Sequence, residues 1–259
     1  MPEEIGCADL KQLFLTGASG RLGSTVTGLF HNRWKIIPCN RSSGADLRRV
    51  LPEDVIPGSA DFVLNCAAVS SRAACLADPV SAFKLNALWP ALLASFCAMK
   101  GKRLVHVSTD LVYSGGVPPY TESSPAVPRC FYGWTKLLGD VAVSRHNPDA
   151  LTVRTSVLVG RAGATLPTFS EDILQGRATL FHVDSFRNHT EIEPFSLFLE
   201  ESLESSSSGL VLAAAPYSMS RAAYAYSLGK TDLMLAPAPL DIPHDLTLKP
   251  SKAIGKFVK

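Results

Sequence analysis

A tyrosine and a lysine four residues apart are the side chains of this sequence best suited to acid–base chemistry. Tyr132 and Lys136 lie in a stretch with helical character, and their spacing places both on one face of a helix. A lysine ammonium near a phenol stabilises the phenolate and lowers the pKa of the tyrosine, so the phenol can donate a proton near neutral pH. Thr109 ends an earlier apolar run and can hydrogen-bond a carbonyl beside that phenol. These residues predict proton donation to a ketone oxygen; an exposed Tyr–Lys pair with a capping threonine is the alternative.

Three glycines at G-x-x-G-x-x-G spacing separate a short apolar run from a segment with helical character. Gly17 permits a tight turn, Gly20 lets the backbone approach a pyrophosphate, and Gly23 lets the helix lie close to the strand. The helix N-terminus adds free N–H groups for phosphates. The turn predicts a dinucleotide-binding site, although an ordinary strand-to-helix turn would share the glycines. The expected contacts in it are Gly17, Ser19, Gly20, Arg21, Leu22 and Gly23.

The residues after the predicted second strand, 35–40, indicate which dinucleotide binds. Enzymes specific for NAD place Asp or Glu there to bind the 2′-hydroxyl of the adenosine ribose. This sequence has Asn40, Arg41 and Ser42 instead. A guanidinium and a hydroxyl match a 2′-phosphate, so we expect NADP(H); a solvated Arg41 is the alternative.

Small and polar residues end two further apolar runs. Cys66, Ala67 and Ala68 are small enough for a cofactor to pass close to the backbone. The run that contains Thr109 also ends in Asp110, and polar groups at the carboxyl end of a parallel strand face the ligand crevice. Asn86 lies on an otherwise apolar helical face, where a buried amide must find partners, and we expect it to bridge two backbone elements.

Apolar runs and helical segments alternate through the first 160 residues. Strands are expected near 13–15, 35–40, 61–68, 103–110 and 152–159, with helices near 24–30, 79–99 and 132–145. This alternation predicts an α/β, Rossmann-type, doubly wound parallel sheet. Later segments alternate less regularly, with helices expected near 194–205 and 218–228 and an extended proline-rich surface tail at 237–250. We therefore expect an NADP-binding Rossmann domain over residues 1–160. Residues 161–259 should form a small substrate-binding lobe that is not an independent domain.

Composition excludes several other classes of protein. The 259 residues are 46% hydrophobic and 19% charged with a net charge of +2, which gives no electrostatic footprint for nucleic acid. No apolar run reaches the roughly 18 residues of a membrane helix, and no apolar signal core is present, so we expect a cytoplasmic protein without a membrane partner. None of the six cysteines forms a C-x-x-C pair, so no metal site is expected.

Taken together, these motifs resemble the extended short-chain dehydrogenase/reductases, and within them the dTDP-4-dehydrorhamnose reductase family. The matching stretches are residues 16–23, 65–68, 78–79 with Asn86, 108–113, 120–122, Pro125, 132–136, 153–156 and 246–252. The resemblance implies that Tyr132 is the general acid, that Lys136 binds the nicotinamide ribose and tunes Tyr132, and that Thr109 polarises the carbonyl. It also places Asp46 near the adenine, beside Leu47; for Asp46 a helix cap is equally open.

Two departures from the family concern the substrate. Residues 69–74 read VSSRAA where the family carries Val-Asp and further acidic residues, and Val157 stands where it carries a tryptophan. We expect Val69, Arg72, Thr109, Asp110 and Val157 to face the substrate. Arg72 would pair with a phosphate or carboxylate, or else lie solvated in a loop. The C-terminal half is also shorter than in typical members.

The expected function is NADPH-dependent reduction of a small-molecule ketone, either a 4-keto sugar nucleotide or another small ketone. Two alternatives remain. One is a non-catalytic NADP-binding regulatory subunit similar to the methionine adenosyltransferase beta subunit, and the other is an NDP-sugar epimerase. The chain could form a homodimer.

Overall fold

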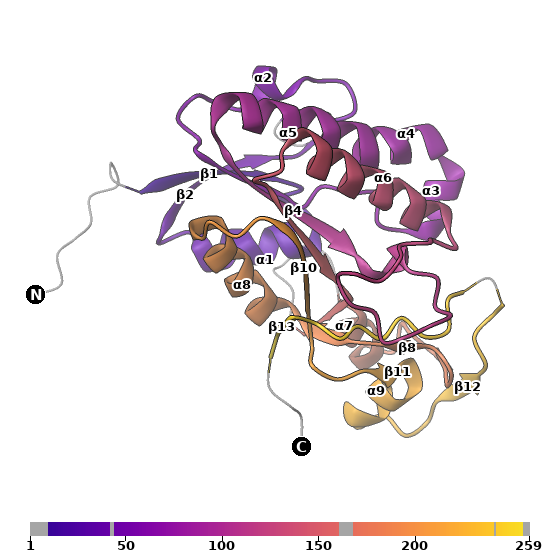
Figure 1. The fold of residues 1–259 in the computed structure, drawn as a ribbon. Coiled ribbons are helices and arrows are strands. Elements are labelled where there is room, and N and C mark those ends of the chain that lie inside the picture. Colours follow the sequence, from indigo (N-terminus) through magenta and orange to yellow (C-terminus); the bar gives the residue numbers. More distant parts are fainter. Residues whose placement is uncertain (1–9, 42–43, 161–167, 241, 256–259) are drawn as a thin grey trace, which may run out of the picture.

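The centre of the molecule is a seven-stranded sheet in the order β13-β10-β5-β4-β3-β1-β2, with every neighbouring pair parallel (Figure 1). The computed structural model describes residues 10–41, 44–160, 168–240 and 242–255. The strands of the sheet are β1 (Lys11–Thr16), β2 (Trp34–Cys39), β3 (Phe62–Asn65), β4 (Arg103–Thr109), β5 (Leu151–Thr155), β10 (Gly209–Ala214) and β13 (Lys252–Ala253). The predicted α/β class with a parallel sheet is confirmed.

Helices cover both faces of this sheet. They are α1 (Arg21–Phe30), α2 (Pro52–Val55), α3 (Arg72–Ala77), α4 (Pro79–Phe83), α5 (Trp89–Lys100), α6 (Phe131–His146), α7 (Phe169–Leu174), α8 (Ile192–Glu204) and α9 (Arg221–Ser227). In Figure 1, α1 and α8 lie below the sheet and α5 and α6 lie above it. Alternate residues of β1 supply the two cores: Leu13 and Leu15 pack on the side of α1 and α8, and Phe14 packs on the side of α5.

The long helix predicted near 79–99 exists but contains a π-helical turn, Lys84–Leu88, between α4 and α5. Pro90 follows this turn directly, and the wider turn accommodates a proline that has no N–H to donate to the preceding turn. By length and composition, Pro79–Lys100 is the one candidate membrane span among the described residues, but half of its apolar window is buried inside the protein. A core helix of a globular protein has this property.

The central sheet extends beyond residue 160. Strands β10 and β13 belong to it, and α8 packs against α1, so the expected boundary at 160 does not separate the sheet from the rest. Strand β10, over 209–214, is as long as β1 and follows α8, so it continues the alternation of helix and strand beyond residue 160. Pro38 does not prevent β2 from forming, because β2 is the edge strand and needs hydrogen bonds on one side only.

A small lobe adjoins the sheet and contains three two-stranded ladders. They pair β6 (Val157–Val159) with β9 (His189–Glu191), β7 (Leu180–His182) with β12 (Met234–Ala236), and β8 (Phe186–Arg187) with β11 (Met219–Ser220). Ile173, Phe181, Ala222 and Ala225 form the lobe's own apolar cluster. The tail is not simply a surface segment, because Leu246 and Leu248 are buried beside Tyr120.

Candidate functional site

Two adjoining cavities lie along the carboxyl ends of β1, β3 and β4, and they share Gly17, Gly20, Cys66 and Ala68. We call them the Arg41 cavity, about 370 Å³, and the Tyr132 cavity, about 610 Å³. The Arg41 cavity is also lined by Ser19, Cys39, Asn40, Arg41, Ala45, Asp46, Leu47, Arg48, Ala67, Val69 and Leu85. The Tyr132 cavity also includes Arg21, Leu22, Gly23, Ser70, Arg72, Val107–Thr109, Leu111, Tyr132, Lys136, Thr155–Leu158, Phe169, Asp172, Arg187 and Arg221.

The glycine turn has the geometry that the spacing predicted. Gly17 has a φ of 70°, in the left-handed region that favours glycine, and its N–H donates to the Cys39 carbonyl at 3.0 Å. A Cβ on Gly17 would come within 2.8 Å of the Ala67 nitrogen, and one on Gly23 would overlap the Gly17 carbonyl. Gly20 is the N-cap of α1 and lines both cavities. The start of α1 therefore opens where the two cavities meet.

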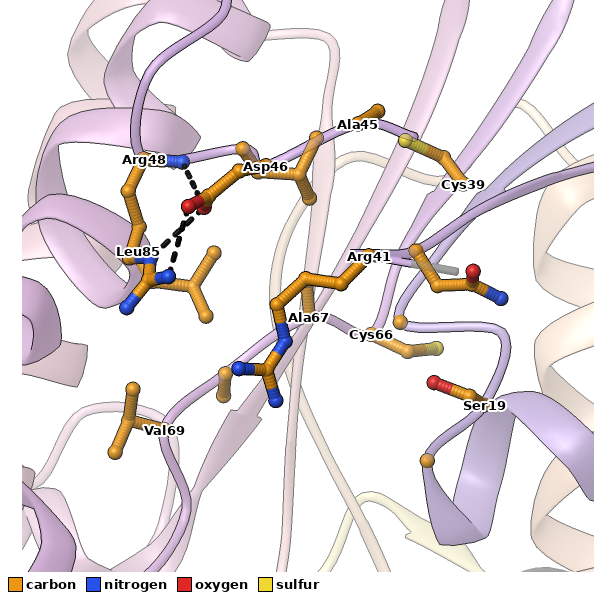
Figure 2. A pocket seen from close by; sticks show the side chains of 15 residues that line it. Ser19, Cys39, Arg41, Ala45, Asp46, Arg48, Cys66, Ala67, Val69 and Leu85 are labelled. Carbon is orange, nitrogen blue, oxygen red and sulfur yellow. Dashed lines mark hydrogen bonds and ion pairs between the residues drawn. The ribbon is translucent and has the colours of Figure 1, made fainter. Parts of the chain in front are cut away.

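Arg41 and Asp46 face the first cavity from the segment after β2. Figure 2 shows the Arg41 side chain extending across the cavity mouth toward Val69, while Asp46 turns to Arg48. The Arg48 guanidinium donates to the Asp46 carboxylate at 2.7 and 2.8 Å, and this hydrogen bonding lowers the pKa of Asp46 to about 2. Asp46 is therefore a fixed carboxylate paired to arginine rather than a helix cap. Ser42 lies outside the described residues.

Arg48 is a lining residue that sequence reasoning missed. Besides holding Asp46, it donates to the Ser81 hydroxyl at 3.0 Å, so it links the segment after β2 to α4. The Asp–x–Arg spacing is the one signal that could have suggested the pair.

Asn86 lies behind the cavities rather than in them. It is fully buried in the π-helical turn, its Oδ1 accepts from the Val69 N–H at 2.8 Å, and its Nδ2 donates to the Val69 carbonyl at 3.1 Å. The same Nδ2 donates to the Thr135 hydroxyl of α6 at 3.0 Å. Asn86 therefore bridges the loop after β3 to α6, as expected; it was also expected to contact the cofactor, but it lines neither cavity and instead supports Val69, which lines the Arg41 cavity.

Tyr132 projects from the first turn of α6, which Cys130 caps. The residue is 8% exposed, and its side chain lines the same cavity as Thr109. Burial and the nearby Asp110 carboxylate raise the pKa of Tyr132, and a hydrogen bond with Thr109 offsets this only in part. The expected lowering by Lys136 is therefore wrong for this structure: the phenol is held in its protonated form.

Lys136 lines the Tyr132 cavity and is held there by buried partners. Its Nζ donates to the Val107 carbonyl at 2.8 Å and lies 3.3 Å from His106 Nε2. Burial lowers the pKa of Lys136, whereas the negative charge of Asp140 raises it. Because these contacts hold the Lys136 ammonium, it does not produce the expected lowering of the Tyr132 pKa.

A buried polar chain runs under α6 and continues from Lys136. Asn65 bonds to His106 Nδ1 at 2.8 Å, and His106 Nε2 lies 3.6 Å from the Asp140 carboxylate. Asp140 accepts from Arg154 at 2.9 Å. Burial and the charge of Lys136 lower the pKa of His106 to about 4, so its imidazole is neutral at pH 7.

Asp110 and Val69 are not where the sequence placed them. Asp110 was expected to face the substrate, but it is fully buried and accepts from Arg187 at 2.5 and 2.7 Å and from Ser156 at 2.5 Å. The ion pair with Arg187 holds the Asp110 carboxylate away from the linings of both cavities. Val69 lines the Arg41 cavity rather than the Tyr132 cavity.

Arg72 and Val157 do line the Tyr132 cavity, opposite two residues of the lobe, Phe169 and Arg221. Sequence reasoning missed Arg187 and Arg221 because they come from late, irregular segments. Among the described residues, no group of three His, Cys, Asp or Glu side chains could hold a metal ion. Burial raises the pKa of the Cys66 thiol to about 12, which leaves it a poor nucleophile.

Comparison with known proteins identifies the relatives of this chain. The dTDP-4-dehydrorhamnose reductase of Mycobacterium tuberculosis is 32% identical over 180 residues, which cover 67% of this chain and 59% of that protein. The methionine adenosyltransferase 2 subunit beta of Xenopus tropicalis is 33% identical over 162 residues, covering 58% of this chain and 48% of that protein. The chain therefore spans about half to three fifths of the length of these curated relatives.

A solved structure shares the fold. The dTDP-4-dehydrorhamnose reductase of Bacillus anthracis, crystallised in complex with NADP, superposes with a TM-score of 0.78 at 22% identity, covering 88% of this chain and 85% of that one. The family model described as the RmlD substrate binding domain matches residues 11–226. The chain therefore belongs to the RmlD substrate binding domain family.

Proposed function

We propose that this protein is an NADPH-dependent reductase that converts a ketone, in first place a sugar-nucleotide ketone, to the alcohol. The observation that carries the proposal is the meeting of a glycine turn with Thr109, Tyr132 and Lys136 along one continuous pair of cavities. The likeness to reductases of this substrate class supports it.

The Arg41 cavity has the donor set that a phosphorylated dinucleotide needs. The start of α1 and Gly17 leave room for a pyrophosphate, since a side chain at Gly17 would fill the space beside Ala67. Arg41 reaches over the cavity to a 2′-phosphate, and Lys136 would hold the nicotinamide ribose. When bound, NADPH supplies the hydride.

The protein's own part in the reaction is to place and protonate the ketone oxygen. Thr109 and Tyr132 would both hydrogen-bond that oxygen, and Tyr132 would donate its proton as negative charge develops there. The raised pKa of Tyr132 keeps the phenol protonated at neutral pH, as a proton donor must be, but it also makes the phenol a weaker acid than one whose pKa the bound cofactor and Lys136 would lower. Lys136 adds positive charge to the same cavity.

The wall of the Tyr132 cavity argues for a substrate other than dTDP-4-dehydrorhamnose itself. Val157 offers no flat surface for a sugar where the resemblance implies a tryptophan. We expect weak or absent turnover of that sugar nucleotide. A specificity constant above about 10⁴ M⁻¹s⁻¹ on it would contradict this expectation.

A screen for NADPH oxidation across keto-sugar nucleotides and small ketones tests the proposal. Steady consumption of NADPH with at least one ketone is expected. Binding of NADPH without consumption over the whole screen would contradict it.

Cofactor choice is tested separately by titration calorimetry. We expect NADP to bind at least about tenfold tighter than NAD, and Arg41→Ala to erode that preference while Arg145→Ala, at an exposed position of α6, leaves it unchanged. Equal affinities for the two cofactors in the unaltered protein would refute the assignment.

A regulatory NADP-binding subunit is the second candidate, favoured by the likeness to methionine adenosyltransferase 2 subunit beta. It predicts tight NADP binding with no ketone reduced. The same screen therefore separates the two functions.

A further inference from the structure

The charges that line the Tyr132 cavity do not balance. Its two acidic groups are already paired: Asp110, beneath the lining, binds Arg187 at 2.5 and 2.7 Å, and Asp172 binds Arg177 at 2.7 Å. Lys136 has Asp140 on the next turn of α6. Arg72 and Arg221 also line the cavity, and they have no such carboxylate.

Arg221 is a desolvated cation without an acidic partner. Its guanidinium stacks over the Phe169 ring at 4.9 Å, and no ion pair joins it to any residue in the described part of the chain. Burial, together with the charges of Arg187 and Arg72, lowers the pKa of Arg221 to about 10, and the negative charge of Asp110, which is itself paired to Arg187, offsets this only in part. Holding a cation in such surroundings costs folding free energy, which a bound anion would recover.

Arg72 approaches the same space from the other side. It begins α3 in the Rossmann part, whereas Arg221 begins α9 in the lobe, and the two charges repel each other. Its side chain makes no hydrogen bond or ion pair with another described residue. It also stands in the stretch where the family resemblance implies acidic residues, so the sign of the charge at this wall is reversed.

The two arginines are separate from the expected 2′-phosphate contact but not from the glycine turn. Neither lines the Arg41 cavity, which holds the candidate 2′-phosphate ligand Arg41. Both share the Tyr132 cavity with the side chains proposed to bind the ketone oxygen and with Gly20 and Arg21 of the turn. An anion that binds between them while NADP occupies the glycine turn would therefore be carried by the substrate.

We propose that Arg72 and Arg221 bind a negatively charged group of the ketone substrate, a phosphate or a carboxylate, and so select anionic ketones. This assignment rests on the proposed reductase function. Guanidinium groups suit either anion because they donate two parallel hydrogen bonds to it.

The test measures binding, so it does not depend on turnover. Inorganic pyrophosphate and malonate are titrated calorimetrically into the full chain saturated with NADP, as probes for a diphosphate and a carboxylate. We expect one of them to bind, and Arg72→Gln or Arg221→Gln to weaken that binding by about 10- to 100-fold. Tighter binding of pyrophosphate identifies a phosphorylated substrate, and tighter binding of malonate identifies a carboxylated one.

Three controls make the result specific. Arg145→Gln should leave anion binding unchanged, Arg221→Lys should retain part of it, and NADP affinity should be the same in all variants. The thermal midpoint of Arg221→Gln, measured beside that of the unaltered protein, separates a loss of anion binding from a loss of folding. Three results would overturn the assignment. They are failure of both pyrophosphate and malonate to bind, unchanged anion binding in the double variant Arg72→Gln with Arg221→Gln, and a loss of NADP affinity that parallels the loss of anion binding. Anion binding through these arginines without any ketone turnover would contradict the reductase function and leave the anion site standing.

Discussion

At the residue scale, the proposed reduction depends on whether the Tyr132 phenol is protonated. Tyr132 is buried, forms a hydrogen bond with Thr109 and lies near the negative charge of Asp110. Both burial and that charge disfavour the phenolate, so the side chain can donate a proton but is a poor base at neutral pH. Reduction of a ketone is the direction of reaction that uses such a group.

Tyr132→Phe removes the hydroxyl and keeps the ring. We expect turnover of an identified ketone to fall by about 10²-fold or more, while NADPH affinity changes little because Lys136 and the glycine turn remain. Steady-state kinetics and fluorescence titration measure the two quantities. Tyr226→Phe, at an exposed tyrosine of α9, is the matched control. Unchanged turnover in Tyr132→Phe would exclude it as the proton donor.

At the element scale, the site depends on how the loop after β3 is held. Asn86 of the π-helical turn accepts from and donates to the backbone of Val69 and also donates to Thr135 of α6. One buried amide thus fixes the wall of the Arg41 cavity relative to the helix that carries Tyr132. Such wide turns recur at functional sites.

Asn86→Ala leaves the Val69 N–H without its partner and leaves the Val69 carbonyl with only the Cys75 thiol as a donor. We expect the free energy of unfolding to fall by about 1–3 kcal/mol and NADPH affinity to weaken, because the loop lines the cofactor cavity. Denaturant unfolding and cofactor titration check both effects. Thr135→Val removes the hydrogen bond from Asn86 and the one that Thr135 donates to the Tyr132 carbonyl, but it keeps both bonds between Asn86 and Val69, so it should show the smaller loss of NADPH affinity. Equal losses in the two variants would mean that the Val69 loop is not what Asn86 holds.

The elements that the sequence predicted correctly are those marked by a distinctive spacing of residues within one short stretch. The glycine turn, the strand ending at Thr109 and the helix bearing Tyr132 and Lys136 each have a distinctive spacing, and each is present. Arg187 and Arg221 carry no local pattern, because folding of the lobe brings them to the Tyr132 cavity. The predicted lowering of the Tyr132 pKa is wrong for a similar reason. The spacing along the helix does not reveal that the Lys136 ammonium donates to the Val107 carbonyl and lies beside His106.

At the scale of the whole molecule, two buried histidines couple folding to pH. His189 of β9 stacks on Tyr224 of α9 at 4.1 Å within the lobe, and neither of its ring nitrogens has a hydrogen-bond partner in the described structure. Burial, with the charges of Arg187 and Arg221, lowers the pKa of His189 to about 3, and burial lowers that of His106 to about 4. Both imidazoles are therefore neutral in the folded protein down to acidic pH.

Stability should fall as the pH drops from about 6.5 towards 4. In this window the unfolded chain binds protons at these histidines and the folded chain does not, so each contributes a slope of up to about 1.4 kcal/mol per pH unit. Urea unfolding of His189→Leu should show a shallower acid-side slope than the unaltered protein, and His146→Leu, at an exposed site, should not. The same slope in all three proteins would contradict the assignment of His189.

Transfer of deuterium from NADPH that carries deuterium at both C4 positions of the nicotinamide tests whether the protein delivers hydride to a ketone. With a ketone selected from the screen, we predict one deuterium on the carbinol carbon of the product, with one NADPH consumed per alcohol formed, and a loss of this transfer in Tyr132→Phe. An epimerase would return the hydride with no net consumption of NADPH, and a regulatory subunit would transfer none. Product without deuterium at that carbon, or tight NADPH binding with no transfer to any ketone, would contradict the account.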